Sequence, residues 1–141
     1  MIHLNSLKDM ERILTDNSTV AVVGLSPKTA RPSHQVAAYL QRAGYRIIPV
    51  NPGQSEILGE VCYPDLTAIP EPVHIVDIFR RSDQVEPIVR QAVDIGARVI
   101  WMQEGIVNRA ACRLARDAGL TVVMDRCLKV EHARLRGCSP A

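Results

Sequence analysis

The amino-acid sequence predicts an α/β fold: a single doubly wound domain with a mostly parallel sheet of five to six strands. Two observations predict it. Short runs rich in Val and Ile recur along the chain, mostly apolar on both faces, as in a parallel sheet covered on both sides. Segments with helical spacing lie between them, as in right-handed crossovers. The strands are expected at residues 20–25, 46–50, 74–79, 98–102 and 121–125.

Helices are expected before, between and after these strands. Pro32 suits the first turn of a helix that ends at Gly44, and Ser82 is a candidate N-cap for one that ends at Gly96. A third apolar stripe ends at Gly119. Two short helices are expected at the ends of the alternating pattern, over residues 7–14 and 128–135.

The segment over residues 52–72 interrupts this alternation. It contains Pro and Gly, and its run EVCY at 60–63 predicts a brief extra strand rather than a full helix-and-strand unit. No repeat or linker divides the chain. Residues 1–136 are therefore expected to form one domain, and residues 137–141 a disordered tail.

Composition and charge limit the kinds of partner. The chain has 141 residues, is 47% hydrophobic and 23% charged, and has a formal net charge of +2. Lys and Arg are scattered, so neither a nucleic-acid nor a membrane surface is expected, and any basic site must be local. Since the chain shows neither a signal-peptide pattern nor an apolar run near the roughly 18 residues that span a bilayer, a cytoplasmic location is expected. Association with copies of itself or with another protein stays open.

The residues that most often carry catalysis or metals form no recognisable set. The four cysteines are far apart without a C-x-x-C pair, which predicts reduced thiols rather than a zinc site or a disulfide scaffold. None of the four histidines pairs with a carboxylate or a cysteine. Asp77, in a predicted strand, is expected to bond neighbouring backbone or a helix end. The sequence thus predicts no metal site and no catalytic residue.

A ligand of this fold is expected at one edge of the sheet. In open α/β sheets, ligands bind in the crevice at the carboxyl ends of the strands. The loops that follow the five predicted strands should therefore converge into one candidate site. These loops are residues 24–33, 51–53, 79–81, 103–105 and 125–127.

The first loop has the features of a pyrophosphate cradle. Gly24 would let a phosphate approach the backbone, and Ser26 adds a hydroxyl donor. The helix opening near Pro32-Ser33 would present N–H groups and the positive end of its dipole. A strand-to-helix turn also needs a small residue for structural reasons alone, so this loop by itself favours a nucleotide site and an ordinary turn about equally.

The second loop disfavours NAD. A dinucleotide site usually has Asp or Glu at the end of the second strand, but here the chain reads Asn51-Pro52-Gly53, without a carboxylate before Glu56. The amide of Asn51 could still bond a ribose hydroxyl. The loops also supply cations, as a ligand with an extra phosphate would need. These cations are Lys28, Arg31, Arg80 and Arg81.

Six motifs follow one another along the chain: VVGLSPK with RPS (22–33), IIPVNP (47–52), GEVCYPDL (59–66), DIFRRS (77–82), WMQEGI (101–106) and MDRCLKVEH (124–132). In this order they resemble the stand-alone CoA-binding proteins with a Rossmann-like fold, a family related to the CoA-binding domain of the succinyl-CoA synthetase α-subunit. Each motif alone is weak, but the ordered set is specific and spans residues 5–136.

The resemblance implies coenzyme A as the ligand. Its pyrophosphate would lie on the 24–33 loop, its adenine end near residues 51–52 and 79–81, and its pantetheine arm toward residues 103–105 and the last strand. The residues that the resemblance assigns to CoA are Gly24, Leu25, Ser26, Lys28, Arg31, Ser33, Asn51, Pro52, Phe79, Arg80, Arg81, Gln103, Glu104, Gly105 and Cys127.

The predicted function is non-catalytic binding of CoA or an acyl-CoA, as a carrier, sensor or subunit. Two alternatives stay open. The chain could be a component of a CoA ligase or transferase that needs a partner polypeptide, or an NAD(H)-responsive regulatory domain.

Cys127 carries a hypothesis about reactivity. If it follows the last strand at the start of a helix, the helix dipole and Arg126 would lower the pKa of its thiol, which could then form a mixed disulfide with CoA. The alternative is that Cys127 is a buried residue capping the last helix.

Overall fold

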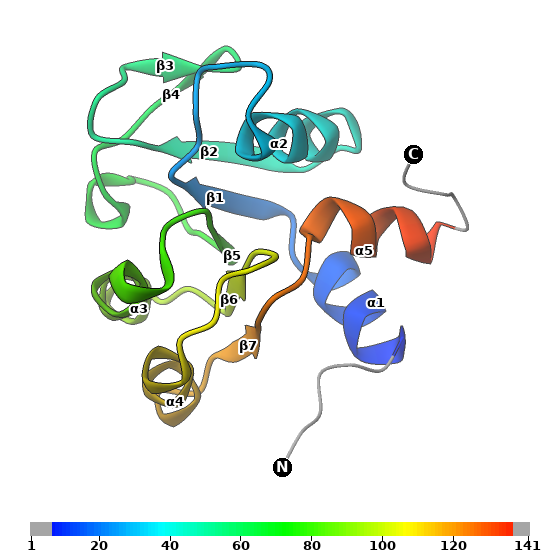
Figure 1. Ribbon diagram of the computed structural model, residues 1–141, viewed down its shortest axis with the longest axis vertical. Helices are drawn as coiled ribbons and strands as arrows, with labels where there is room; N and C mark the ends of the chain where they lie inside the picture. The colour runs from blue at the N-terminus through cyan, green and yellow to red at the C-terminus, as the bar shows by residue number, and fades with distance from the viewer. Residues whose placement is uncertain (1–6, 137–141) are drawn as a thin grey trace.

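The structure, a computed structural model, describes residues 7–136 and contains a five-stranded sheet whose neighbouring strands are all parallel. The strand order is β2-β1-β5-β6-β7, so the direction of winding reverses between β1 and β5 (Figure 1). The predicted doubly wound α/β class is confirmed. The strands are β1 (Thr19–Val23), β2 (Arg46–Val50), β5 (Ile75–Ile78), β6 (Val99–Met102) and β7 (Thr121–Val123).

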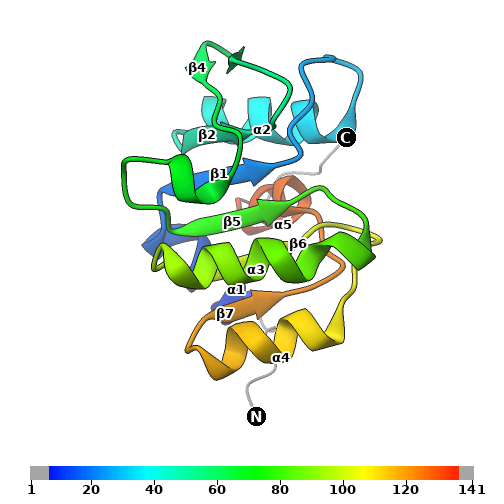
Figure 2. The ribbon, with the colours of Figure 1, turned by 90° about the vertical axis from the view of Figure 1, so that its left-hand side faces the viewer.

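Helices cover both faces of the sheet (Figure 2). Buried residues of α3 and α4 share one apolar cluster with alternate strand residues, and those of α1, α2 and α5 share another cluster with the residues between them. This explains why the strands are apolar on both faces. The helices are α1 (Leu7–Asp16), α2 (Pro32–Arg42), α3 (Val85–Asp94), α4 (Arg109–Asp117) and α5 (Leu128–Leu135), with the short 3-10 helices η1 (Leu66–Ala68) and η2 (Ser82–Gln84).

The predicted elements are all present, but some of their ends differ. The apolar runs extend past the carboxyl ends of β1 and β7, because the chain turns at Gly24 with φ +88° and at Asp125 with φ +58°. The prediction for Ser82 is wrong: it begins η2 ahead of α3, and its Oγ accepts a hydrogen bond from the Val107 N–H at 3.0 Å. Its hydroxyl therefore joins two loops instead of capping a helix.

The predicted extra strand belongs to a small hairpin outside the main sheet. β3 (Glu56–Ile57) pairs antiparallel with β4 (Glu60–Val61). The two residues between them, Leu58 and Gly59, both have positive φ, as a tight type I′ turn requires. A single parallel bridge from Tyr63 to Val50 attaches this segment to the edge of the main sheet.

Two further sequence-based expectations concern membranes and the tail. Within residues 7–136, no helix combines the length and apolarity needed to cross a bilayer. The tail expected at residues 137–141 lies outside the described residues.

Candidate functional site

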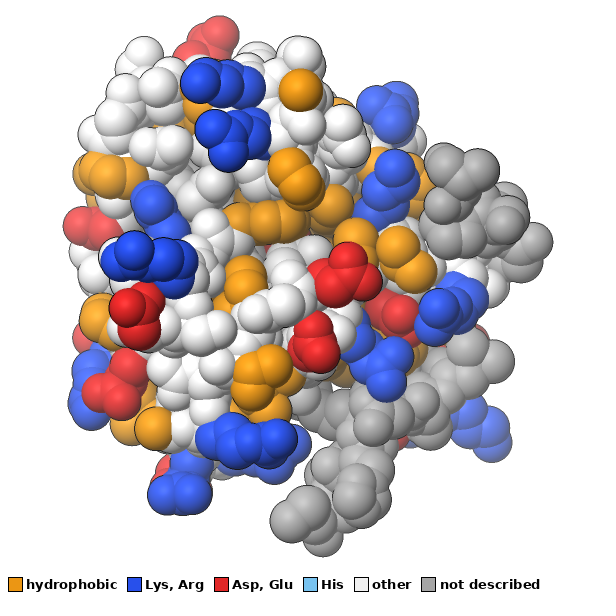
Figure 3. Space-filling view, viewed as in Figure 1, with side chains coloured by type: hydrophobic (Ala, Val, Ile, Leu, Met, Phe, Trp, Pro, Cys, Tyr) orange, Lys and Arg blue, Asp and Glu red, His pale blue; other side chains and the backbone are white. Residues whose placement is uncertain are grey.

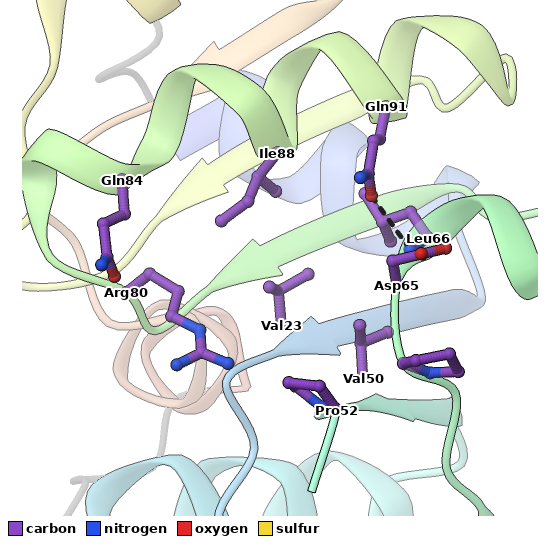
Figure 4. Close-up of a pocket in the computed structure, with 10 residues that line it drawn as sticks. Val23, Val50, Pro52, Asp65, Leu66, Arg80, Gln84, Ile88 and Gln91 are labelled. Carbon is purple, nitrogen blue, oxygen red and sulfur yellow. Dashed lines mark hydrogen bonds between the residues drawn. The ribbon is translucent and has the colours of Figure 1, made fainter.

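Two cavities lie at the carboxyl ends of the strands, near the reversal point between β1 and β5. Cavity A, of about 240 Å³, lies on the α3 side of the sheet (Figure 4). Cavity B, of about 440 Å³, lies on the α2 and α5 side. The residues lining cavity A include Val23, Val50, Pro52, Leu66, Arg80, Gln84 and Ile88, and those lining cavity B include Pro32, Val36, Phe79, Arg80, Arg81, Gln103, Glu104, Ile106 and Cys127.

Gly24 is required by the packing of the two central strands. Its N–H donates to the carbonyl of Val50 at 2.9 Å, and its φ is +88°. A Cβ at this position would lie 2.4 Å from the carbonyl oxygen of Phe79 and 3.3 Å from Nε of Arg80. The sequence predicts close approach of a phosphate at Gly24, but the space on the Cβ side of this residue is filled by the neighbouring loop.

The first loop is held by its own serines. The Ser26 N–H donates to the buried hydroxyl of Ser33 at 3.0 Å, and the Lys28 N–H donates to Ser26 Oγ at 3.1 Å. Ser33 therefore supports the loop from inside instead of facing a ligand. Leu25 is also fully buried, so this predicted site residue presents no exposed surface on the loop.

Two predicted cations lie on the outside of the same loop. Lys28 and Arg31 are exposed and line neither cavity A nor cavity B. Arg31 is the N-cap residue of α2 but makes no side-chain capping hydrogen bond, and Pro32 follows it in the first turn. The N-terminus of α2, the positive end of the helix dipole, thus has no side-chain cap and lies beside the exposed side chains of Lys28 and Arg31.

The second loop is tied to the first. Asn51 Nδ2 donates to the carbonyl of Leu25 at 3.0 Å, and Asn51 Oδ1 accepts from the Gly53 N–H at 2.9 Å. Asn51 therefore braces two loops, and both ends of the amide that the sequence left open to a ribose hydroxyl are used in this brace. The adjacent Pro52 lines cavity A, as a ligand-facing residue would.

The third loop supplies the residue common to both cavities. Arg80 lines cavity A and cavity B, and its guanidinium extends from the end of β5 toward the end of β1 (Figure 4). Phe79 and Arg81 line cavity B only. Arg81 is largely exposed and lies 3.5 Å from Asp83, a pair that water screens. Arg80 is therefore the central cation of the site.

The fourth and fifth loops are bonded to each other. The Gly105 N–H donates to Asp125 Oδ1 at 2.6 Å, and Trp101 Nε1 donates to the carbonyl of Arg126 at 2.7 Å. Asp125 adopts a left-handed backbone, which costs energy for a residue with a side chain. Gly105 is held in this brace and lines neither cavity. The bonds fix Gln103, Glu104 and Cys127 around cavity B.

Asp77 lies buried below cavity B, on β5. Its cross-strand neighbours Val22 and Trp101 are apolar and fully buried. Burial raises the pKa of Asp77 to about 8, against the effect of a hydrogen bond from Gln103 Nε2 to Oδ1 at 2.6 Å. A neutral carboxyl is the form that this apolar layer tolerates at neutral pH. The expected bond to backbone or a helix end is wrong, because the partner is a side chain of the next loop.

The hypothesis of an activated Cys127 is contradicted. Cys127 immediately precedes α5, as predicted, and lines cavity B. Burial nevertheless raises the pKa of its thiol, and the nearby carboxyl groups of Asp77 and Glu104 raise it further, which outweighs the backbone N–H groups at the start of α5. Cys127 is therefore a mostly protonated thiol at neutral pH.

We expect slow alkylation of Cys127 in the ligand-free protein. The test uses a variant in which the last of the four cysteines is replaced, Cys138→Ser. At pH 7, iodoacetamide should react with Cys127 at least about tenfold more slowly than it reacts with the thiol of glutathione, because burial and the raised pKa both lower the amount of accessible thiolate. Peptide mass spectrometry would measure the rate, and a Cys127→Ser variant would identify the signal. Labelling as fast as that of glutathione at pH 7 would contradict the raised pKa.

Several lining residues were not predicted from the sequence. One wall of cavity A is formed by Leu66 of η1, Gln84 of η2, and Ile88 and Gln91 of α3. None of these follows a strand. The packing of α3 on the sheet and its contact with η1, where the Leu66 N–H donates to Gln91 Oε1 at 3.2 Å, bring them to the site. In residues 7–136, no three His, Cys, Asp or Glu side chains are grouped to hold a metal.

Comparison with known proteins identifies relatives over most of the chain. The protein YneT of Bacillus subtilis strain 168 is 42% identical over 128 residues, which cover 91% of this chain and 95% of the relative. A hypothetical protein of Pyrococcus horikoshii OT3 has the same fold with a TM-score of 0.91 at 41% identity, covering 94% of this chain and 93% of the other.

A more distant relative is a multidomain enzyme. The ADP-forming acetate–CoA ligase I of Archaeoglobus fulgidus is 26% identical over 129 residues, covering 84% of this chain but only 19% of the ligase. The family described as CoA binding domain matches residues 18–133, a span that includes every loop of the site. The resemblance seen in the sequence is confirmed, and the chain belongs to the CoA binding domain family, with relatives among CoA ligases.

Proposed function

We propose that the protein binds CoA along the carboxyl edge of its sheet. The nucleotide end would occupy cavity A, the pyrophosphate would lie beside the 24–33 loop, and the pantetheine arm would enter cavity B. The observation that carries this proposal is that Arg80 lines both cavities, so that a guanidinium is available to a phosphate group spanning them.

The lining of cavity A suits a purine base. Val23, Val50 and Ile88 offer apolar surfaces to the faces of a ring, and Gln84 offers an amide to its polar edge (Figure 4). At about 240 Å³ the cavity is smaller than typical sites for whole ligands. It would therefore receive only one end of CoA, and the rest would extend across the loop toward cavity B.

The charge at this edge suits the three phosphates of CoA. Besides Arg80, the exposed Lys28 and Arg31 lie beside the uncapped first turn of α2. Neither forms an ion pair within the described part of the chain, so both are available to an anion. Backbone N–H groups at a helix start and flexible cations together form a favourable phosphate site.

The test is calorimetric titration of ligand-stripped protein with CoA, 3′-dephospho-CoA and NAD. We expect CoA to bind most tightly and the loss of its 3′-phosphate to weaken binding, because the site has more cationic side chains than a pyrophosphate alone would require. NAD lacks a carboxylate partner at the end of β2 and should bind weakly. Binding of NAD in preference to CoA, or of none of the three, would reject the proposal.

Replacing the shared arginine should weaken CoA binding strongly. Arg80→Ala should raise the Kd for CoA by about 10–100-fold, since a charge-assisted hydrogen bond contributes about 1.5–3 kcal/mol. Arg90→Ala is the matched control, because Arg90 bonds Glu86 on the exposed side of α3 and lines neither cavity. Calorimetry would measure both; equal Kd values for the two variants would assign the phosphate to other residues.

A second candidate is a subunit role in a CoA ligase. It is favoured by the relation to the ADP-forming acetate–CoA ligase, of which the chain matches about a fifth. In that role the chain would supply the CoA site and a partner polypeptide the remaining chemistry. The purified chain with acetate, ATP and CoA should then form acetyl-CoA only when such a partner is added, whereas turnover by the chain alone would contradict the subunit role and leave CoA binding in place.

A further inference from the structure

The buried carboxyl of Asp77 has one oxygen in use and one without a partner. Oδ1 accepts from Gln103 Nε2 at 2.6 Å, whereas Oδ2 is the buried side-chain atom that lacks a hydrogen-bond partner among the described residues. Asp77 is 0% exposed. Because Oδ1 accepts, the proton of the neutral carboxyl belongs on Oδ2.

This bond fixes which way the Gln103 amide points. Gln103 is 3% exposed, with its side-chain nitrogen turned inward to Asp77. With the proton on Oδ2, turning the amide over would place its oxygen against the acceptor Oδ1 and remove the hydrogen bond; the turned amide would regain a bond only if the proton moved to Oδ1. The amide oxygen, Oε1, is thus directed away from Asp77, in a residue that lines cavity B.

Gln103 Oε1 is a hydrogen-bond acceptor in a cavity whose lining is otherwise mostly apolar. Cavity B is otherwise lined largely by apolar groups, from Pro32, Val36, Phe79 and Ile106. The carboxylate of Glu104 is exposed, so its hydrogen bonds compete with water. An N–H group that enters the cavity would lose its water and would need an acceptor there.

We propose that Asp77 and Gln103 act as an orientation lock, in which Asp77 positions the Gln103 amide so that Oε1 accepts a hydrogen bond from a secondary amide N–H of the ligand's arm. Gln103 is the residue that contacts the ligand, and Asp77 is a positioning residue. This inference rests on the proposed CoA binding, since the pantetheine arm carries two secondary amides. The inference assigns cavity B to an uncharged part of the ligand that carries amide groups.

Two probes separate the arm from the nucleotide. CoA carries the arm, whereas adenosine 3′,5′-bisphosphate is the nucleotide end without it. Gln103→Met keeps the length of the side chain but removes the acceptor, so the Kd for CoA should rise about 5–10-fold while that for the bisphosphate changes less than about twofold. Gln84→Met, in cavity A, is the matched control and should leave the ratio of the two Kd values unchanged.

The role of Asp77 is tested by coupling. Asp77→Leu removes the acceptor for Nε2 and should weaken CoA binding as much as Gln103→Met does, and the double variant should be no weaker than either single one. Asp77→Asn, which still offers an oxygen to Nε2, should keep CoA affinity within about twofold of the wild type. Thermal unfolding of each variant would confirm that it is folded.

The outcomes distinguish the inference from the function on which it rests. If the wild type binds both probes but Gln103→Met binds CoA normally, or weakens both probes equally, the orientation lock is rejected and CoA binding stands. If Asp77→Leu and Gln103→Met weaken CoA binding additively, Asp77 does not act through Gln103. If the wild type binds neither probe, the proposed function fails and the inference fails with it.

Discussion

The stability that Asp77 contributes should be lost as the pH rises from about 4 to about 8, and Asp77→Asn should abolish this part of the pH dependence of the free energy of unfolding. The reason is the carboxyl of Asp77, whose pKa burial raises to about 8 in the folded protein, whereas an unfolded Asp titrates near 4. Between these values the folded state binds more protons than the unfolded state, so stability decreases with pH. Below about 4 and above about 8 the effect is constant.

The size of this effect is set by the difference between the two pKa values. Each unit is equivalent to about 1.4 kcal/mol, and structural relaxation reduces the total, so we expect a loss of about 3–5 kcal/mol across the window. Urea unfolding of both proteins at several pH values would measure it. Asp83→Asn, on the exposed η2, is the control and should follow the wild type. Parallel curves for wild type and Asp77→Asn would show that Asp77 is ionised at neutral pH.

Gly24→Ala should destabilise the protein by about 2–5 kcal/mol. The added Cβ would meet the carbonyl oxygen of Phe79 at 2.4 Å, and φ at this position is +88°. The backbone conformation alone costs a non-glycine residue about 1–2 kcal/mol, and overpacking between β1 and β5 costs about 1–3 kcal/mol more.

Gly44→Ala separates these two contributions. Gly44 also has a positive φ, of +101°, but a Cβ there meets nothing within 4 Å. Its loss of stability should therefore be about 1–2 kcal/mol, the backbone cost alone. Urea unfolding would measure both variants. Equal losses at the two positions would mean that the Phe79 carbonyl moves aside without cost.

The fold could be predicted because its signals are local and repeated. The parallel strands are apolar on both faces, and the glycines that end α2, α3 and α4 follow the helical stripes directly. The small hairpin was harder, since two-residue strands carry no alternation. The role of Ser82 could not be read from sequence, because its partner is 25 residues away in another loop.

The site could be predicted at the level of loops more than of side chains. Carboxyl ends of parallel strands converge by geometry alone, and this predicted Pro52 at cavity A, Arg80 at both cavities and part of the lining of cavity B. The sequence did not predict Pro32, Val36 and Ile106, which also line cavity B. Whether a loop side chain faces in or out depends on its partners, and so Leu25 and Ser33 face the protein interior. For Cys127, the helix dipole was visible in the sequence but the burial that outweighs it was not.

The bonds that join the loops have a consequence for how fast a ligand can bind. Asn51 joins the first two loops, Ser82 joins the η2 segment to the loop after β6, and Asp125 joins the last two. The conformational entropy of these loops is lost when the protein folds, so the loops at the carboxyl edge of the sheet are already ordered before a ligand binds. The association rate constant would then be set by diffusional encounter with the cationic side chains of the site, and ligands would differ mainly in their dissociation rate constants.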